Sequence, residues 1–126
     1  MIQDRTLVAI ADNTGAKVGR IFKVLGGSKK RIATIGDTVI LSVQTAEPRK
    51  MVKKKEVLTA VVVRQKKPFR RTDGSYIKFD DNAVVILAKN PKDPFEPKAN
   101  RVFGPIPREL VDLGYQKIGS MAPEVV

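Results

Sequence analysis

Two stretches of the sequence decide the fold: DTVILSVQT at residues 37–45 and VLTAVVV at residues 57–63. In the first, Val39, Leu41 and Val43 alternate with mostly more polar neighbours, which is the period-two pattern of a strand with one buried face. The second is almost continuously apolar and rich in β-branched residues, which is typical of a strand well buried in a barrel or sandwich. Both stretches predict β-structure at the centre of the chain.

Further short strands are predicted on either side of this pair, at residues 5–11, 17–25, 76–79 and 83–87. The Asp73-Gly74 pair is a hairpin signal, because these residues accept the backbone angles of a tight turn. Five or six short strands joined by turns, with no long helix between them, favour a small closed antiparallel barrel of about five strands. The expected fold class is therefore mainly β.

The helical signal comes only near the end of the chain. Pro107 can occupy the first turn of a helix that runs through Leu110 and ends at Gly114. Before it, residues 89–100 carry three prolines and predict a stiff irregular loop. With 126 residues in all, we expect one domain, with its helical segment at about 105–126.

The residue inventory argues against an enzyme. Cysteine and histidine are both absent, which removes disulfides, thiolate chemistry, zinc-finger spacing and imidazole catalysis. Asp80-Asp81 is read as an ordinary turn pair, and Gly26-Gly27-Ser28-Lys29 lacks the spacing of a phosphate-binding loop. The sequence thus predicts no catalytic residue, cofactor, metal or small-molecule substrate.

Neither a signal peptide nor a membrane span is expected. The start of the chain has no long apolar segment with a small-residue cleavage site. No apolar run approaches the roughly 20 residues that cross a bilayer.

Positive charge is concentrated in one part of the chain. The net charge is +11, and residues 17–71 contain 16 Lys and Arg against 3 acidic residues. A basic excess of this density repels itself unless a polyanion neutralises it, and phosphate backbones do so. A solvated basic surface is the alternative, but nucleic acid is the favoured partner.

Within this part, the bases fall on predicted loops and on a predicted hairpin at about residues 64–79. This hairpin, the ribbon, has many charges and few core residues, so it is expected to project from the barrel and lie along RNA. Aromatic residues are too few for a stacking platform, which favours recognition of shape and backbone. The candidate RNA-binding residues in these segments are Lys29, Lys30, Arg31, Arg49, Lys50, Lys53, Lys54, Arg64, Lys66, Lys67, Arg70 and Arg71.

Several motifs occur in a fixed order along the chain. The central signature is Ala60-Val61-Val62-Val63, then Asp73-Gly74, then Phe79, Asn82 and Val84-Val85. The remaining motifs are Met1-Ile2-Gln3, residues 8–16, residues 23–28, Gly36-Asp37, residues 101–105, Arg108-Glu109-Leu110 and residues 122–125. Together these motifs cover almost the whole chain and make it resemble one family, the universal large-subunit ribosomal protein fourteen family of bacterial type.

The resemblance implies a five-stranded barrel with a projecting ribbon and short C-terminal helices. It also implies a ribosome-bound protein, in the cytoplasm or an organelle, that binds 23S ribosomal RNA at the subunit interface and reaches 16S ribosomal RNA through inter-subunit bridges. The implied protein partners are ribosomal proteins three and nineteen and a ribosome-silencing factor. Arg101 and Lys117 are the candidates for the silencing-factor surface, although Arg101 could instead brace the turn at residues 103–105.

Two departures from the family lie near that surface. The loop at residues 89–100 is a few residues longer than usual, and residues 118–121 contain Gly and Met where larger aliphatic residues are common. The alternative function is a free RNA chaperone with an oligonucleotide-binding barrel, which would share the charge and the strands but not the order of the motifs.

Overall fold

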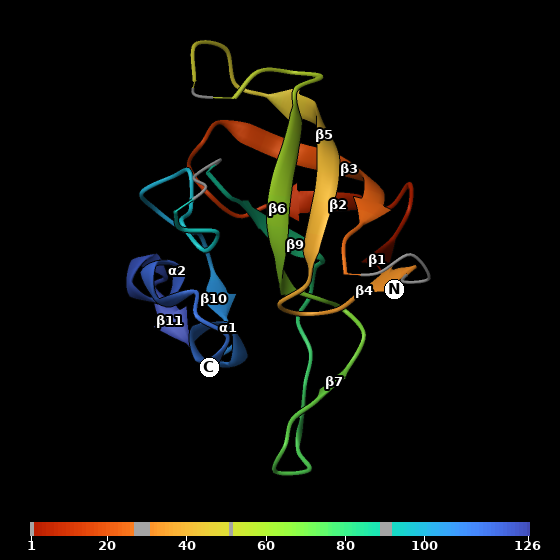
Figure 1. The fold of residues 1–126 in the computed structure, drawn as a ribbon, viewed down its shortest axis with the longest axis vertical. Coiled ribbons are helices and arrows are strands. Elements are labelled where there is room, and N and C mark those ends of the chain that lie inside the picture. Colours follow the sequence, from red (N-terminus) through yellow and green to blue (C-terminus); the bar gives the residue numbers. More distant parts are fainter. Residues whose placement is uncertain (1, 27–30, 51, 89–91) are drawn as a thin grey trace.

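The computed structural model describes residues 2–26, 31–50, 52–88 and 92–126. Figure 1 shows a barrel with a long ribbon extending from one end and a helical segment packed at one side. The barrel strands are β2 (Leu7–Ile10), β3 (Ala16–Val24), β5 (Thr38–Ala46), β6 (Val57–Arg64) and β9 (Ala83–Ile86). They close in the order β2-β3-β5-β6-β9. The predicted mainly β fold and the closed five-stranded barrel are confirmed.

The barrel is mixed and not purely antiparallel, which corrects one part of the prediction. Each strand runs antiparallel to the one before it in this order, but β9 pairs with β2 in parallel. The reason is the odd number of strands: when five strands alternate in direction, the first and the last point the same way. Closing the ring therefore requires one parallel pair.

Burial along the two deciding strands follows the sequence pattern. Val39, Leu41 and Val43 of β5 are fully buried, while the residues between them are only partly buried. On β6, residues 60–63 are all fully buried, because this strand has the barrel interior on one side and the C-terminal segment on the other. The side chains of β6 accordingly divide between two core clusters, with Val62 inside the barrel and Val61 and Val63 outside it.

Buried Asp12 joins the turn after β2 to β9. One carboxylate oxygen accepts hydrogen bonds from the Thr14 amide and hydroxyl, and the other accepts from the Ile86 amide at 2.8 Å. Burial raises the pKa of this carboxyl, and the three hydrogen bonds oppose that effect. Through these hydrogen bonds Asp12 ties the turn after β2 to β9.

Smaller elements surround the barrel. A two-stranded sheet joins β1 (Ile2–Gln3) to β4 (Ile32–Ala33), and the ribbon is formed by β7 (Phe69–Arg70) and β8 (Tyr76–Ile77). The C-terminal segment contains β10 (Pro105–Ile106), α1 (Glu109–Asp112), α2 (Gln116–Met121) and β11 (Glu124–Val125). The predicted helix before Gly114 is confirmed, and that glycine ends it with φ of +114°.

Candidate nucleic-acid interface

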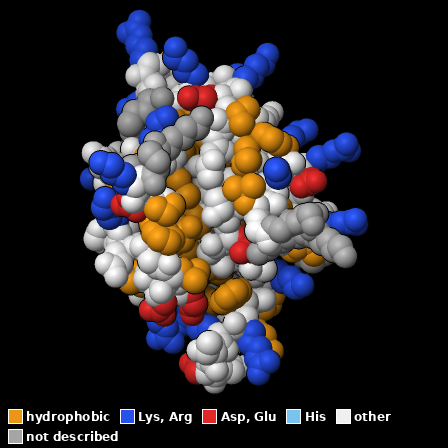
Figure 2. Space-filling view, in the orientation of Figure 1, with side chains coloured by type: hydrophobic (Ala, Val, Ile, Leu, Met, Phe, Trp, Pro, Cys, Tyr) orange, Lys and Arg blue, Asp and Glu red, His pale blue; other side chains and the backbone are white. Residues whose placement is uncertain are grey.

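The candidate cations lie at two opposite ends of the barrel. The loop at residues 47–56 precedes β6 and lies at one end of the barrel, and the ribbon follows β6 at the other end (Figure 1). An eight-residue strand rises about 3.3 Å per residue, so roughly 25 Å of β6 separates these ends. Figure 2 shows Lys and Arg side chains extending from both ends of the molecule. The exposed candidate cations therefore lie on two surfaces, which we call the loop surface and the ribbon surface.

The loop surface is held in place by one buried residue. Val52 is fully buried in the core, and its amide donates to the Thr14 carbonyl at 3.2 Å. Lys50 also packs closely against Gly15, because a Cβ at position 15 would collide with the Cβ of Lys50. With Val52 anchored, the four predicted RNA contacts of this loop are exposed: Arg49, Lys50, Lys53 and Lys54.

The ribbon surface contains the exposed cations Arg31, Lys66, Lys67 and Arg70. Two amide side chains fix the backbone at the root of the ribbon. Asn82 Oδ1 accepts from the Lys66 amide at 2.9 Å, and the side chain of Gln65 donates to the Lys67 carbonyl at 2.9 Å. These cations are thus mounted on an ordered root. Lys29 and Lys30, which precede Arg31, lie outside the described residues.

Arg64 and Arg71 differ from the other candidates because contacts within the chain engage them. Arg64 is buried, pairs with Asp81 at 2.9 Å, and donates to the carbonyls of Phe103 and Pro105 at 2.8 and 3.1 Å. Arg71 Nε lies 2.8 Å from Glu109 Oε1, and its Nη2 donates to the main-chain oxygen of Val126. Both residues fasten the ribbon to the C-terminal segment.

The two candidate docking residues are also exposed. Lys117 on α2 lies 3.3 Å from Asp93 Oδ2 in the proline-rich loop, and Arg101 lies just before the turn at residues 103–105. The contact that braces that turn comes from Arg64, whose carbonyl partners belong to it. At Gly119, a Cβ would approach Val111 Cγ2 to 2.6 Å, so this glycine allows α1 and α2 to pack closely.

Neither a metal site nor a membrane helix is found in the part of the chain that the structure describes. No group of three or more Asp and Glu side chains is placed to hold a metal ion there. None of the helices among these residues is long and apolar enough to cross a bilayer. Asp81, one of the two adjacent acids considered as catalytic candidates, is the ion-pair partner of Arg64.

A small closed barrel with exposed cations at both ends is typical of one class, the proteins that bind nucleic acid. The comparison with known families narrows this class. The family described as ribosomal protein L14p/L23e matches residues 1–126, the whole chain. The chain belongs to this family and is a structural protein of the large ribosomal subunit.

Proposed function

We propose that this protein binds 23S ribosomal RNA through its ribbon surface. The observation that carries the proposal is the set of exposed cations at and beside the root of a ribbon that extends away from the barrel (Figure 1). Lys66, Lys67 and Arg70 are the principal contacts in this proposal, together with Arg31 and the neighbouring Lys29 and Lys30. Exposed cations at such positions can neutralise the phosphates of an RNA backbone.

We further propose that the loop surface contacts a second RNA, the 16S ribosomal RNA of the small subunit, as an inter-subunit bridge. The separation of the two surfaces by the length of β6 supports this division. Arg49, Lys50, Lys53 and Lys54 are the bridge residues in the proposal. A protein with cations at both ends can contact two RNA surfaces that face each other.

The C-terminal segment is the proposed surface for protein neighbours, namely ribosomal proteins three and nineteen and a ribosome-silencing factor. Exposed apolar side chains support this assignment, because Phe103, Leu113 and Val125 are each 44–53% exposed. Arg101 and Lys117 supply exposed charge beside them. We assign Arg64 and Arg71 to holding this segment in place rather than to RNA.

The proposal is tested with a triple variant in which Ala replaces Lys66, Lys67 and Arg70. Its binding to 23S ribosomal RNA is measured over a range of salt concentrations. We expect weaker binding and a salt slope reduced by about two to three, since each lost phosphate contact removes one released counterion. The matched control replaces Lys17, Arg20 and Lys23, three exposed cations on β3, and removes the same charge. Equal losses in both variants would contradict a ribbon-specific contact.

The same experiment separates the alternative function. A free RNA chaperone should bind unrelated RNA of the same length as tightly as it binds 23S ribosomal RNA. A ribosomal protein should prefer its own RNA and sediment with large subunits at physiological salt. Recovery of the protein only in the fractions without ribosomes would contradict the proposal.

A further inference from the structure

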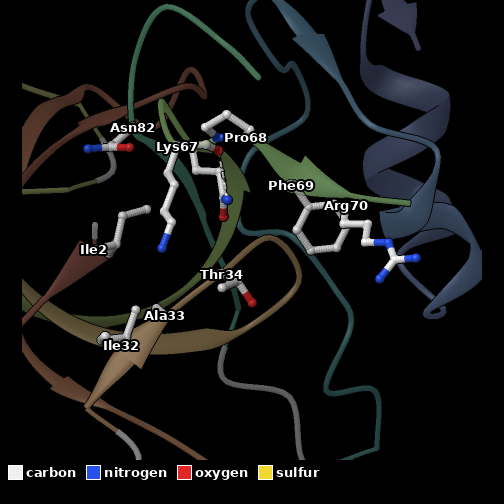
Figure 3. A pocket seen from close by; sticks show the side chains of 10 residues that line it. Ile2, Ile32, Ala33, Thr34, Lys67, Pro68, Phe69, Arg70 and Asn82 are labelled. Carbon is white, nitrogen blue, oxygen red and sulfur yellow. Dashed lines mark hydrogen bonds between the residues drawn. The ribbon is translucent and has the colours of Figure 1, made fainter. Parts of the chain in front are cut away.

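A cavity lies between the β1–β4 sheet and the root of the ribbon. Its volume is about 210 Å³. Figure 3 shows Ile2, Ile32 and Ala33 on one side and Phe69 on the other, with the Lys67 side chain extending between them and Arg70 pointing away. Pro68 lies on the wall next to Lys67. The cavity thus combines mostly apolar walls with a cation, and Thr34, Gln65 and Asn82 add polar groups to its lining.

The charges around this cavity are of one sign. Among the residues that the structure describes, its lining includes Lys67 and Arg70 and contains no Asp or Glu. The cavity between the ribbon and α1, by contrast, is lined by Asp73, Glu109 and Asp112 as well as by three arginines. Of these two hollows beside the ribbon, only the first is suited to a ligand that carries negative charge.

The walls of the cavity are formed before any ligand arrives. Gln65 Oε1 accepts from the Ile35 amide at 3.1 Å while its side-chain nitrogen donates to the Lys67 carbonyl. Asn82 fixes the Lys66 amide from the other side of the root. Fixed walls avoid the entropic cost of ordering them on binding, which favours a specific ligand over a transient contact.

We propose that this cavity binds one unstacked base of ribosomal RNA, with the adjoining phosphate at Lys67. The size is suitable, because an apolar cavity of about 150 Å³ already accommodates benzene. Proteins that read RNA commonly take single bases out of loops and bulges and pack them against apolar or aromatic side chains. The inference rests on the proposed binding to 23S ribosomal RNA and adds a contact to a base, which carries sequence information that phosphate contacts lack.

The direct test places a photoreactive amino acid at Ile32, which is 41% exposed at the cavity, in protein assembled into large subunits. Irradiation should crosslink it to one unpaired nucleotide. The matched control carries the same amino acid at Leu7, an exposed aliphatic residue on β2 that does not line the cavity. Crosslinks from position 32 to many paired nucleotides, or only to protein, would overturn the proposal.

A second measurement uses the uncharged variants Ile32→Ser and Leu7→Ser. Ile32→Ser should weaken binding to 23S ribosomal RNA about fivefold, the low end of the range for one stacked base, with an unchanged salt slope. The unpaired nucleotide should also lose its protection from chemical modification. Leu7→Ser should match the wild type in both respects, and thermal melts should show that both variants stay folded.

The outcomes distinguish this inference from the proposed function. If both serine variants bind and protect 23S ribosomal RNA as the wild type does, the base-binding cavity is refuted and the phosphate contacts of the ribbon stand. If the wild type itself has no preference for 23S ribosomal RNA, the proposed function fails and the cavity proposal falls with it.

Discussion

Strand β6 and the ribbon follow each other directly in the chain, yet they are held by different forces. β6 pairs with β5 on one side and β9 on the other, and residues 60–63 are fully buried. The ribbon pairs only with itself, through two residues on each strand, and its apolar residues Phe69 and Ile77 are only partly buried. A lone two-stranded hairpin is marginally stable in water. The barrel is therefore stable by its own packing, whereas the ribbon depends on what it is fastened to.

The fastening is electrostatic and lies on one side of the ribbon. At the root of the ribbon, Arg64 donates hydrogen bonds to the turn at residues 103–105. Arg71 forms an ion pair with Glu109 and donates a hydrogen bond to Val126. Nearer the tip, Asp73 lies 3.8 Å from Arg108. The ribbon and the C-terminal segment thus form one unit, which can be weakened without unfolding the barrel.

The largest expected effect comes from breaking the barrel. Val62→Asp places a charge among the side chains of the barrel interior, where no cation among the described core residues can pair with it. Burying an unpaired charge costs several kcal/mol, so the variant should be unfolded at room temperature. The control is Val57→Asp, since Val57 lies on the same strand and is 51% exposed. Circular dichroism and a thermal melt measure both, and a folded Val62→Asp variant would contradict the packing described.

A smaller effect is expected at the joint between the two regions. Arg64→Ala leaves the Phe103 and Pro105 carbonyls without their donor and Asp81 without its cation. We expect a loss of about 2–3 kcal/mol, below the 3–5 kcal/mol of a fully buried pair, because the Asp81 side chain is 43% exposed. Chemical denaturation measures the loss.

Hydrogen exchange shows where that loss falls. In Arg64→Ala, amide exchange should be fastest at residues 103–126, while the amides of β5 stay protected. Uniformly faster exchange across the barrel would mean that Arg64 supports the whole fold and not the joint.

Two adjacent arginines sharpen the comparison within the ribbon itself. The Arg71 side chain is 13% exposed and pairs with Glu109. The Arg70 side chain is exposed and has no ion pair or hydrogen bond to any of the described residues. Arg71→Ala should lower stability by about 1–2 kcal/mol, because a half-buried Glu109 loses its cation. Arg70→Ala should leave the melt unchanged and weaken RNA binding. The opposite assignment of the two effects would refute the division of roles made here.

The sequence predicted the barrel well because its signal is local. Alternation at Val39, Leu41 and Val43 and the apolar run of β6 report burial directly, and the structure confirms both. The parallel pair of β2 and β9 was not predicted, although an odd number of alternating strands requires it. The sheet of β1 with β4 was also missed, since two-residue strands carry almost no periodic signal.

The sequence identifies the candidate cations but does not show what each of them contacts in the fold. Composition and spacing select Arg64, Arg70 and Arg71 equally, because all three are arginines near one hairpin. Only the fold shows that the partners of Arg64 and Arg71 lie 17 to 55 positions away in the chain. The cavity beside Ile32 likewise joins segments that range from Ile2 to Asn82 in the chain, and no local sequence pattern predicts it.

The smallest expected effect concerns the tip of the ribbon. Asp73 accepts hydrogen bonds from the Ser75 amide at 2.9 Å and the Ser75 hydroxyl at 2.6 Å, and these bonds lower the pKa of Asp73 below its ordinary value of 3.8. A lowered pKa means that the folded ribbon favours the ionised carboxylate. This contribution is fully present above pH 3.8 and is lost as the pH falls through the lower, folded value.

A carbon-detected NMR titration of the Asp73 carboxyl measures this effect, with a midpoint expected below 3.8. Ser75→Ala should raise the midpoint, because it removes the hydroxyl donor, while the barrel amides stay unchanged. Since Asp73 is at the exposed end of the ribbon, acid should loosen the turn and leave β6 intact. If the midpoint does not move in Ser75→Ala, the Ser75 hydroxyl does not lower the pKa of Asp73, and the hydrogen bond from the amide of residue 75 remains as the cause.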